Sequence, residues 1–242
     1  MPTLIFDCDG VLADTEMHGH LPAFNQAFEE LGVPIHWSVD VYGEKVKIGG
    51  GKERMRSEFT PELAARWDGY PATDAEVDEL ILALHRRKTD IYTDLVDRGR
   101  IEPRPGIGRI AREAHDAGWR LAVASTSAEP SVRAVLRRAV GDDLYERFAV
   151  FAGDIVPEKK PAPDIYLRAL EDTGTDASDA VVVEDSGIGV RAARAAGIAT
   201  VVTVSAYTGD DDFTGAALVL PDLGSTTFDQ IETVLATARR GA

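Results

Sequence analysis

Two aspartates separated by a single residue follow a short apolar run near the start of the chain. Asp7 and Asp9 come directly after Thr3–Phe6, and Gly10 is next. Alternate side chains of an extended segment point to the same side, so the two carboxylates are expected to lie together, while Gly10 permits a turn. Paired carboxylates can act as nucleophile and general acid–base, or bind a divalent cation. An isolated pair of this kind is also common in polar loops, so only further polar groups near the pair can distinguish a reactive site from such a loop.

Three further polar segments follow later in the chain. They contain Ser125 and Thr126, then Lys160, and finally Glu184 and Asp185. Hydroxyls and loop N–H groups can hold a phosphate, and a lysine can neutralise its charge. Each segment alone is more often a turn, a solvated lysine or a helix cap. Because the carboxyl ends of parallel strands meet at one edge of a sheet, we expect these segments to converge with the aspartate pair.

The combined set predicts a magnesium-dependent phosphoryl-transfer site. An anionic nucleophile that approaches a phosphate is repelled unless cations neutralise both groups, and Mg²⁺ together with a lysine meets this need. The predicted metal ligands are the acids Asp7, Asp9, Glu184 and Asp185. The predicted catalytic residues are Asp7, Asp9, Ser125 and Lys160.

The apolar runs that precede most of these residues predict a parallel sheet. The runs cover residues 3–6, 120–124, 149–152, 180–183 and 199–204. Small or acidic residues and then a helical pattern follow each run, which is typical of an α/β fold. We therefore predict a Rossmann-like parallel sheet core with helices on both faces.

A second domain is predicted between the first two runs. Residues 7–119 are too many for a single crossover connection, and residues 14–95 have a mostly helical pattern. We predict an all-helical cap domain over residues 14–95, inserted into a core of residues 1–13 and 96–242.

The composition excludes several other classes of protein. The chain has 41 acidic and 26 basic residues, a formal net charge of -15, so most of its surface would repel nucleic acid. Its apolar runs are shorter than the roughly 20 residues that span a bilayer, so no membrane insertion is expected. Cys8 is the only cysteine, which fits a reducing compartment, and we expect a cytoplasmic protein. The oligomeric state is left open.

The four polar segments resemble, in order, the motifs of the haloacid dehalogenase-like superfamily of phosphotransferases. The matching residues are Asp7 and Asp9, Ser125, Lys160, and Glu184 and Asp185. The resemblance implies that Asp7 attacks phosphorus and forms an aspartyl-phosphate, while Asp9 protonates the leaving oxygen and then deprotonates water. Dehalogenase members lack the second acid, so Asp9 favours phosphoryl chemistry, and we predict a phosphoric monoester hydrolase.

The predicted cap is similar to that of the group containing β-phosphoglucomutase, and segments 14–16, 23–25, 49–54 and 88–92 are similar to the CbbY family of sugar-bisphosphate phosphatases. This resemblance implies a small phosphorylated sugar, such as xylulose bisphosphate, as substrate. The predicted substrate-binding residues are Thr15, Glu16, His20, Lys52, Arg54, Lys88 and Thr126, with Arg54 and Lys88 proposed for a second phosphate. The resemblance places a histidine one residue before His20, where this chain has Gly19, so His18 stays an alternative to His20.

Two other functions remain open at this point. A β-phosphoglucomutase-like sugar phosphomutase would use the same core residues and return the phosphoryl group to another hydroxyl. A non-catalytic phosphoacceptor signalling domain also combines an acidic pair, a hydroxyl and a lysine. Its acceptor would end the third strand, whereas Asp7 follows the first predicted strand.

Overall fold

Short apolar segments of the chain form a parallel sheet. In the computed structural model, which describes residues 1–241, the sheet has six strands in the order β3-β2-β1-β4-β5-β6. The strands are β1 (Thr3–Phe6), β2 (Arg120–Ser125), β3 (Phe148–Ala152), β4 (Ala180–Glu184), β5 (Ala199–Thr203) and β6 (Leu218–Leu220). The central strands β1 and β4 are buried throughout, as expected for apolar strands covered on both faces. The edge strand β6 was not predicted from the sequence.

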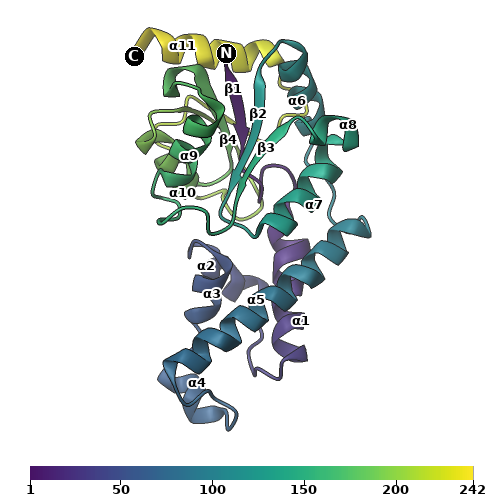
Figure 1. Ribbon diagram of the computed structural model, residues 1–242, viewed down its shortest axis with the longest axis vertical. Helices are drawn as coiled ribbons and strands as arrows, with labels where there is room; N and C mark the ends of the chain where they lie inside the picture. The colour runs from purple at the N-terminus through teal and green to yellow at the C-terminus, as the bar shows by residue number, and fades with distance from the viewer. Residues whose placement is uncertain (242) are drawn as a thin grey trace. The chain divides into compact units, whose positions relative to one another are not determined.

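Helices cover both faces of this sheet (Figure 1). On one face, α9 (Asp164–Thr173) and α10 (Gly187–Ala195) pack their apolar residues against Ile5, Ala122 and Val182. Helices α6 (Ile107–Asp116) and α7 (Glu129–Val140) lie on the other side, with α8 (Asp142–Tyr145) beside α7 and α11 (Phe228–Gly241) completing the chain. The predicted Rossmann-like core is confirmed.

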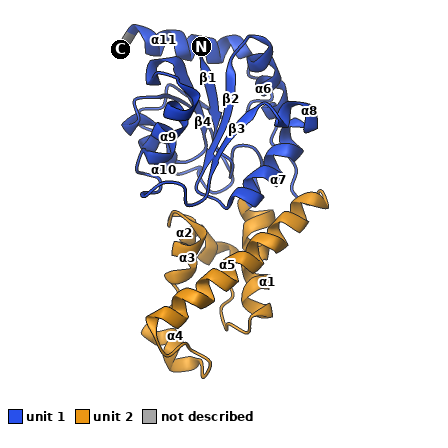
Figure 2. Cartoon of the chain, viewed as in Figure 1, with its two compact units in different colours: residues 1–15, 101–242 blue, residues 16–100 orange. Residues whose placement is uncertain are grey.

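The chain divides into two compact units (Figure 2). The first contains Met1–Thr15 and the chain from Ile101 onward, and the second contains Glu16–Arg100. The corresponding boundaries predicted from the sequence lie between residues 13 and 14 and between residues 95 and 96. The longest helix of the second unit runs on to Asp97, which accounts for the later second boundary.

All regular structure of the second unit is helical. It consists of a short π-helix (Glu16–His20), α1 (Leu21–Glu30), α2 (Val39–Lys45), α3 (Gly51–Arg56), α4 (Pro61–Arg66) and α5 (Asp74–Asp97). A capping box between Thr73 and Glu76 starts α5. The core of the unit is aromatic, with Phe24 and Trp37 in contact at 4.9 Å between ring centroids. None of the described helices is long and apolar enough to cross a membrane.

Candidate active site

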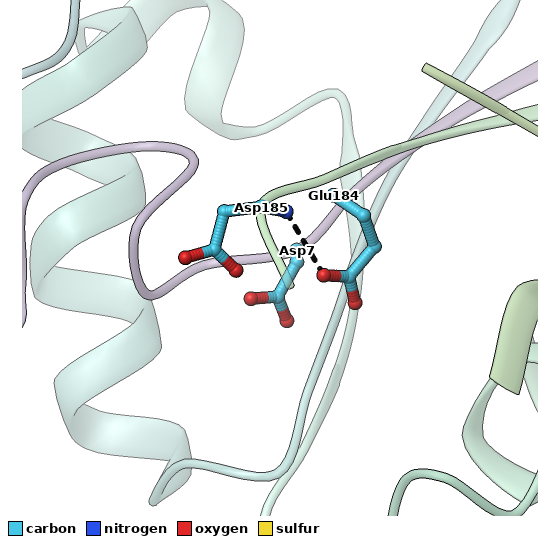
Figure 3. A group of neighbouring side chains, drawn as sticks. All are labelled: Asp7, Glu184 and Asp185. Carbon is cyan, nitrogen blue, oxygen red and sulfur yellow. Dashed lines mark hydrogen bonds between the residues drawn. The ribbon is translucent and has the colours of Figure 1, made fainter. Parts of the chain in front are cut away.

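The sheet register brings the predicted acidic residues together. Phe6 of β1 pairs with Val183 of β4, so Asp7 and Glu184 come next at the same level of the sheet. The strand order reverses direction between β1 and β4, and α/β sheets bind their ligands at such a point. One carboxylate oxygen from each of Asp7, Glu184 and Asp185 lies within 4.8 Å of the others (Figure 3). These three buried acids form the centre of the candidate site.

Two glycines allow the acids to pack directly against the backbone. Gly10 has a φ of 77°, and a Cβ atom there would lie 2.0 Å from Asp185 Oδ2. A Cβ atom at Gly189 would lie 1.9 Å from the carboxyl group of Glu184. Larger residues at these two positions would therefore displace the carboxylates.

Lys160 bridges two of the three acids. Its Nζ atom donates hydrogen bonds to Asp7 Oδ1 at 2.6 Å and to Glu184 Oε1 at 2.7 Å. It also donates to the carbonyl of Ala124, at 3.2 Å, near the end of β2. The lysine side chain is only 8% exposed, so its charge acts in a poorly solvated environment.

The electrostatic balance of this cluster favours an additional cation. Desolvation by burial raises the pKa of Asp7 to about 7, although Lys160 acts in the opposite direction. Burial also raises the pKa of Asp185 well above its usual range, and the charges of Glu184 and Asp7 add to this rise. Burial by itself would lower the pKa of Lys160, but the two carboxylates that it contacts raise that pKa well above its usual range. Three buried carboxyl groups share one ammonium group, and a divalent cation would balance the remaining charge.

Glu184 differs from the other two acids because both of its oxygens are enclosed by donors. Oε1 accepts from Lys160 and, at 2.6 Å, from the hydroxyl of Tyr166. Oε2 accepts from the backbone N–H of Asp185 at 3.0 Å, drawn as a dashed line in Figure 3, and from Ser186. Burial would raise the pKa of Glu184, but Lys160 and these hydrogen bonds lower it overall. Glu184 is therefore suited to hold Lys160, and Asp7 and Asp185 are better placed to bind Mg²⁺.

Asp9, which is also a predicted metal ligand, accepts hydrogen bonds from two hydroxyl groups. Its Oδ1 atom accepts a hydrogen bond from the Thr15 hydroxyl at 2.6 Å, and its Oδ2 atom accepts one from the Ser127 hydroxyl. The acidic group found among the described residues does not include Asp9. Both carboxylate oxygens accept from hydroxyls, and the roles of Asp9 as a metal ligand and as a general acid and base stay predictions. Thr15, predicted to bind substrate, is fully buried, and its hydroxyl donates to Asp9.

The hydroxyls after β2 lie beside this centre. Ser125 is buried, and its Oγ atom accepts a hydrogen bond from the N–H of Ser127 at 3.1 Å. Thr126 is partly exposed between them. Sequence reasoning missed Ser127 as a site residue. The available signal was its position two residues after Ser125, which makes it a candidate for the same side of the segment.

Two of the predicted substrate-binding residues pair with each other in the second unit. The guanidinium of Arg54 donates to the Tyr42 hydroxyl at 2.6 Å and lies 3.4 Å from Glu16 Oε2. Tyr42 in turn donates to Glu16. Arg54 is buried, and Lys52 is half-buried in the same helix.

Two other predicted substrate-binding residues, His20 and Lys88, contact each other and aromatic rings of the same unit. Lys88 Nζ lies 2.7 Å from His20 Nδ1 and 4.7 Å from the centroid of Phe24. The His20 ring stacks on Tyr92 at 4.2 Å. His20 and Lys88 are buried, whereas His18 is exposed. The buried residues His20, Arg54 and Lys88 are called the basic group.

Comparisons with known proteins agree with this geometry. Residues 1–197 match the family described as haloacid dehalogenase-like hydrolase. The chain is 45% identical to a CBBY-like protein of Arabidopsis thaliana over 225 residues, covering 91% of this chain and 69% of that protein. It is 44% identical to the plasmid-encoded protein CbbY of Cupriavidus necator over 243 residues, covering 100% and 93% of the two chains.

A solved structure is similar over nearly the whole chain. It is the crystal structure of a CbbY mutant from Rhodobacter sphaeroides in complex with xylulose-(1,5)bisphosphate. The TM-score is 0.81 at 38% sequence identity, and the match covers 93% of this chain and 96% of that one.

Proposed function

This chain belongs to the haloacid dehalogenase-like hydrolase family, and we propose that it is a magnesium-dependent phosphatase of a sugar bisphosphate such as xylulose bisphosphate. The observation that carries the proposal is the cluster of Asp7, Asp185, Glu184 and Lys160 at the point where the strand order reverses. The substrate is supported by the 38% identical CbbY whose crystal structure contains xylulose-(1,5)bisphosphate.

In the proposed first step, a carboxylate oxygen of Asp7 attacks the phosphorus atom. The bond between phosphorus and the sugar oxygen breaks, and Asp9 gives its proton to that oxygen. The hydrogen bonds from Thr15 and Ser127 hold Asp9 in place for this transfer. The products are an aspartyl-phosphate and the dephosphorylated sugar hydroxyl.

In the proposed second step, Asp9 accepts a proton from water. The water oxygen attacks phosphorus, the bond to Asp7 breaks, and inorganic phosphate is released. Asp7 returns to its carboxylate form and Asp9 carries a proton again, so the cycle closes. One pair of aspartates thus serves both steps.

Repulsion between Asp7 and the phosphate is the main electrostatic obstacle. Lys160, already 2.6 Å from Asp7, offsets part of it, and the buried Ser125 hydroxyl is proposed to hold a phosphate oxygen. Asp7 and Asp185 would hold Mg²⁺, with Glu184 beside them. The bound ion supplies positive charge that neutralises the nucleophile and the phosphate.

The basic group of the second unit is proposed to bind the phosphate that does not react. His20, Arg54 and Lys88 are all buried, and aromatic rings rather than water surround much of their surface. Basic groups in such surroundings attract an anion strongly because little solvent screens them.

The proposal is tested by measuring phosphate release from a panel of sugar monophosphates and bisphosphates, with and without Mg²⁺. We expect Mg²⁺-dependent release that is fastest with xylulose bisphosphate and absent in Asp7→Asn. Conversion of one sugar monophosphate to its isomer without release would instead assign a phosphomutase. A stable phosphorylated protein without turnover would assign a phosphoacceptor domain.

A further inference from the structure

The segment that follows β5 contacts Asp185 and, two residues later, Gly187. Ser205 donates a hydrogen bond from its hydroxyl to Asp185 Oδ2 at 2.7 Å. Six residues later, Asp211 Oδ2 accepts a hydrogen bond from the N–H of Gly187 at 2.8 Å, at the start of α10. The carboxylate of Asp185 is therefore held by a part of the chain that contains none of the predicted catalytic residues.

We propose that Ser205 is a positioning residue for the cation site. Its hydroxyl fixes one oxygen of Asp185, so the carboxylate keeps a single orientation and offers its other oxygen to the cation. Partners of this kind commonly orient metal-binding carboxylates and tune their affinity. The inference rests on the proposed function, because it takes Asp185 as a ligand of Mg²⁺.

The direction of the hydrogen bonds supports this role. A carboxylate that binds a cation is ionised and can only accept hydrogen bonds, so the proton between Ser205 and Asp185 belongs to Ser205. The Oγ atom of Ser205 is 3.1 Å from the hydroxyl oxygen of Thr208, which can donate to it in turn. Thr208 is buried, and it also accepts from the N–H of Ser205 at 2.9 Å. Ser205 is thus held by Thr208 while it donates to Asp185.

The backbone at Ser205 is also anchored. The guanidinium of Arg104 donates to the carbonyl of Val204 at 2.6 Å and to that of Thr203 at 2.9 Å. The same guanidinium donates to the carbonyl of Gly10, in the loop that follows β1. Arg104 therefore ties the segment carrying Ser205 to the loop that carries the two catalytic aspartates. A rigid anchor of this kind lets a hydroxyl restrict a neighbouring carboxylate.

Calorimetric titration of Mg²⁺ into the substrate-free protein tests the inference. We expect Ser205→Ala to weaken Mg²⁺ binding by about 10- to 100-fold. Ser205→Thr keeps the donor and should restore binding close to that of the wild type. Ser131→Ala is the matched control, because this buried hydroxyl of α7 has no hydrogen-bond partner among the described residues. Its Mg²⁺ affinity should be unchanged.

The outcomes separate the two proposals. If the wild-type protein and Ser205→Ala bind Mg²⁺ with the same affinity, the role of Ser205 is overturned and the proposed function is left intact. If the wild-type protein binds no Mg²⁺, the proposed function is overturned, and the role of Ser205 with it. If Ser205→Ala does not fold, Ser205→Cys is measured instead. Its thiol is a weak donor, so the same loss of affinity is expected, and wild-type affinity overturns the inference.

Discussion

Replacing Glu184 by glutamine should destabilise the fold although the two side chains have nearly the same size. The carboxylate is fully buried and accepts from Lys160 and Tyr166 on one oxygen, and from Asp185 and Ser186 on the other. A glutamine has one acceptor oxygen and one NH₂ group. In either orientation the NH₂ group faces donors that have lost their acceptor.

The size of the effect follows from these contacts. Each buried donor left without an acceptor costs about 1–3 kcal/mol, so two of them cost about 2–6 kcal/mol. Breaking a buried ion pair by removing one partner costs about 3–5 kcal/mol by a separate measure. The ranges overlap at about 3–5 kcal/mol. At about 2–4 °C per kcal/mol for a chain of 242 residues, the melting temperature should fall by about 6–20 °C.

Thermal unfolding without Mg²⁺, followed by circular dichroism, measures this loss. Glu171→Gln on the exposed surface of α9 is the matched control, and a surface change of this kind should stay within about 0.5 kcal/mol. A loss below about 1 kcal/mol for Glu184→Gln would refute the reasoning, because it would mean that the buried donors find other acceptors.

Three further predictions address the chemistry. Asp9→Asn should slow turnover by roughly 10²- to 10⁴-fold, measured as phosphate release, and an unchanged rate would remove Asp9 from general acid–base catalysis. Arg54→Ala should lower kcat/KM for the bisphosphate by about 10- to 100-fold more than for an aryl phosphate, with Arg66→Ala in α4 as the exposed control. Equal losses on both substrates would assign Arg54 to folding through Glu16 and Tyr42. Because the folded state keeps the Asp7 proton up to about pH 7, Mg²⁺-free stability should fall as pH rises from about 4 to about 7. Stabilisation by Mg²⁺ should correspondingly be larger at pH 8 than at pH 5.5 in thermal unfolding, and equal shifts would contradict a cation on Asp7.

The core could be predicted from the sequence because its strands are continuous apolar runs. Three of the runs end where a chemically distinctive residue begins, namely Asp7, Ser125 or Glu184, and parallel pairing then brings Asp7 and Glu184 to one level. The family membership and the phosphatase class expected from this arrangement are confirmed. Strand β6 was not predicted because it has only three residues, is partly exposed and lies at the edge of the sheet, so it has no long apolar run.

The surroundings of the acids could not be predicted in the same way. Hydrogen bonds around the site come from Ser127, Ser205 and Arg104, which lie in loops whose paths depend on tertiary packing. Serine is an ordinary residue in turns, so its presence there was no signal. The spacing of Asp7 and Asp9 also does not reveal the two hydroxyls, on Thr15 and Ser127, that donate to the Asp9 carboxylate.

The distribution of partners also supports our proposal of a divalent cation at this site rather than a second basic side chain. Lys160 pairs with both Asp7 and Glu184, so its one positive charge leaves two negative charges unbalanced when all three acids are ionised. A second buried lysine could balance only one of these charges. A divalent ion balances both, and its charge remains available to a phosphate oxygen. In the proposed mechanism Asp7 must be ionised to attack phosphorus, so a bound cation that lowers the pKa of Asp7 would also prepare the nucleophile.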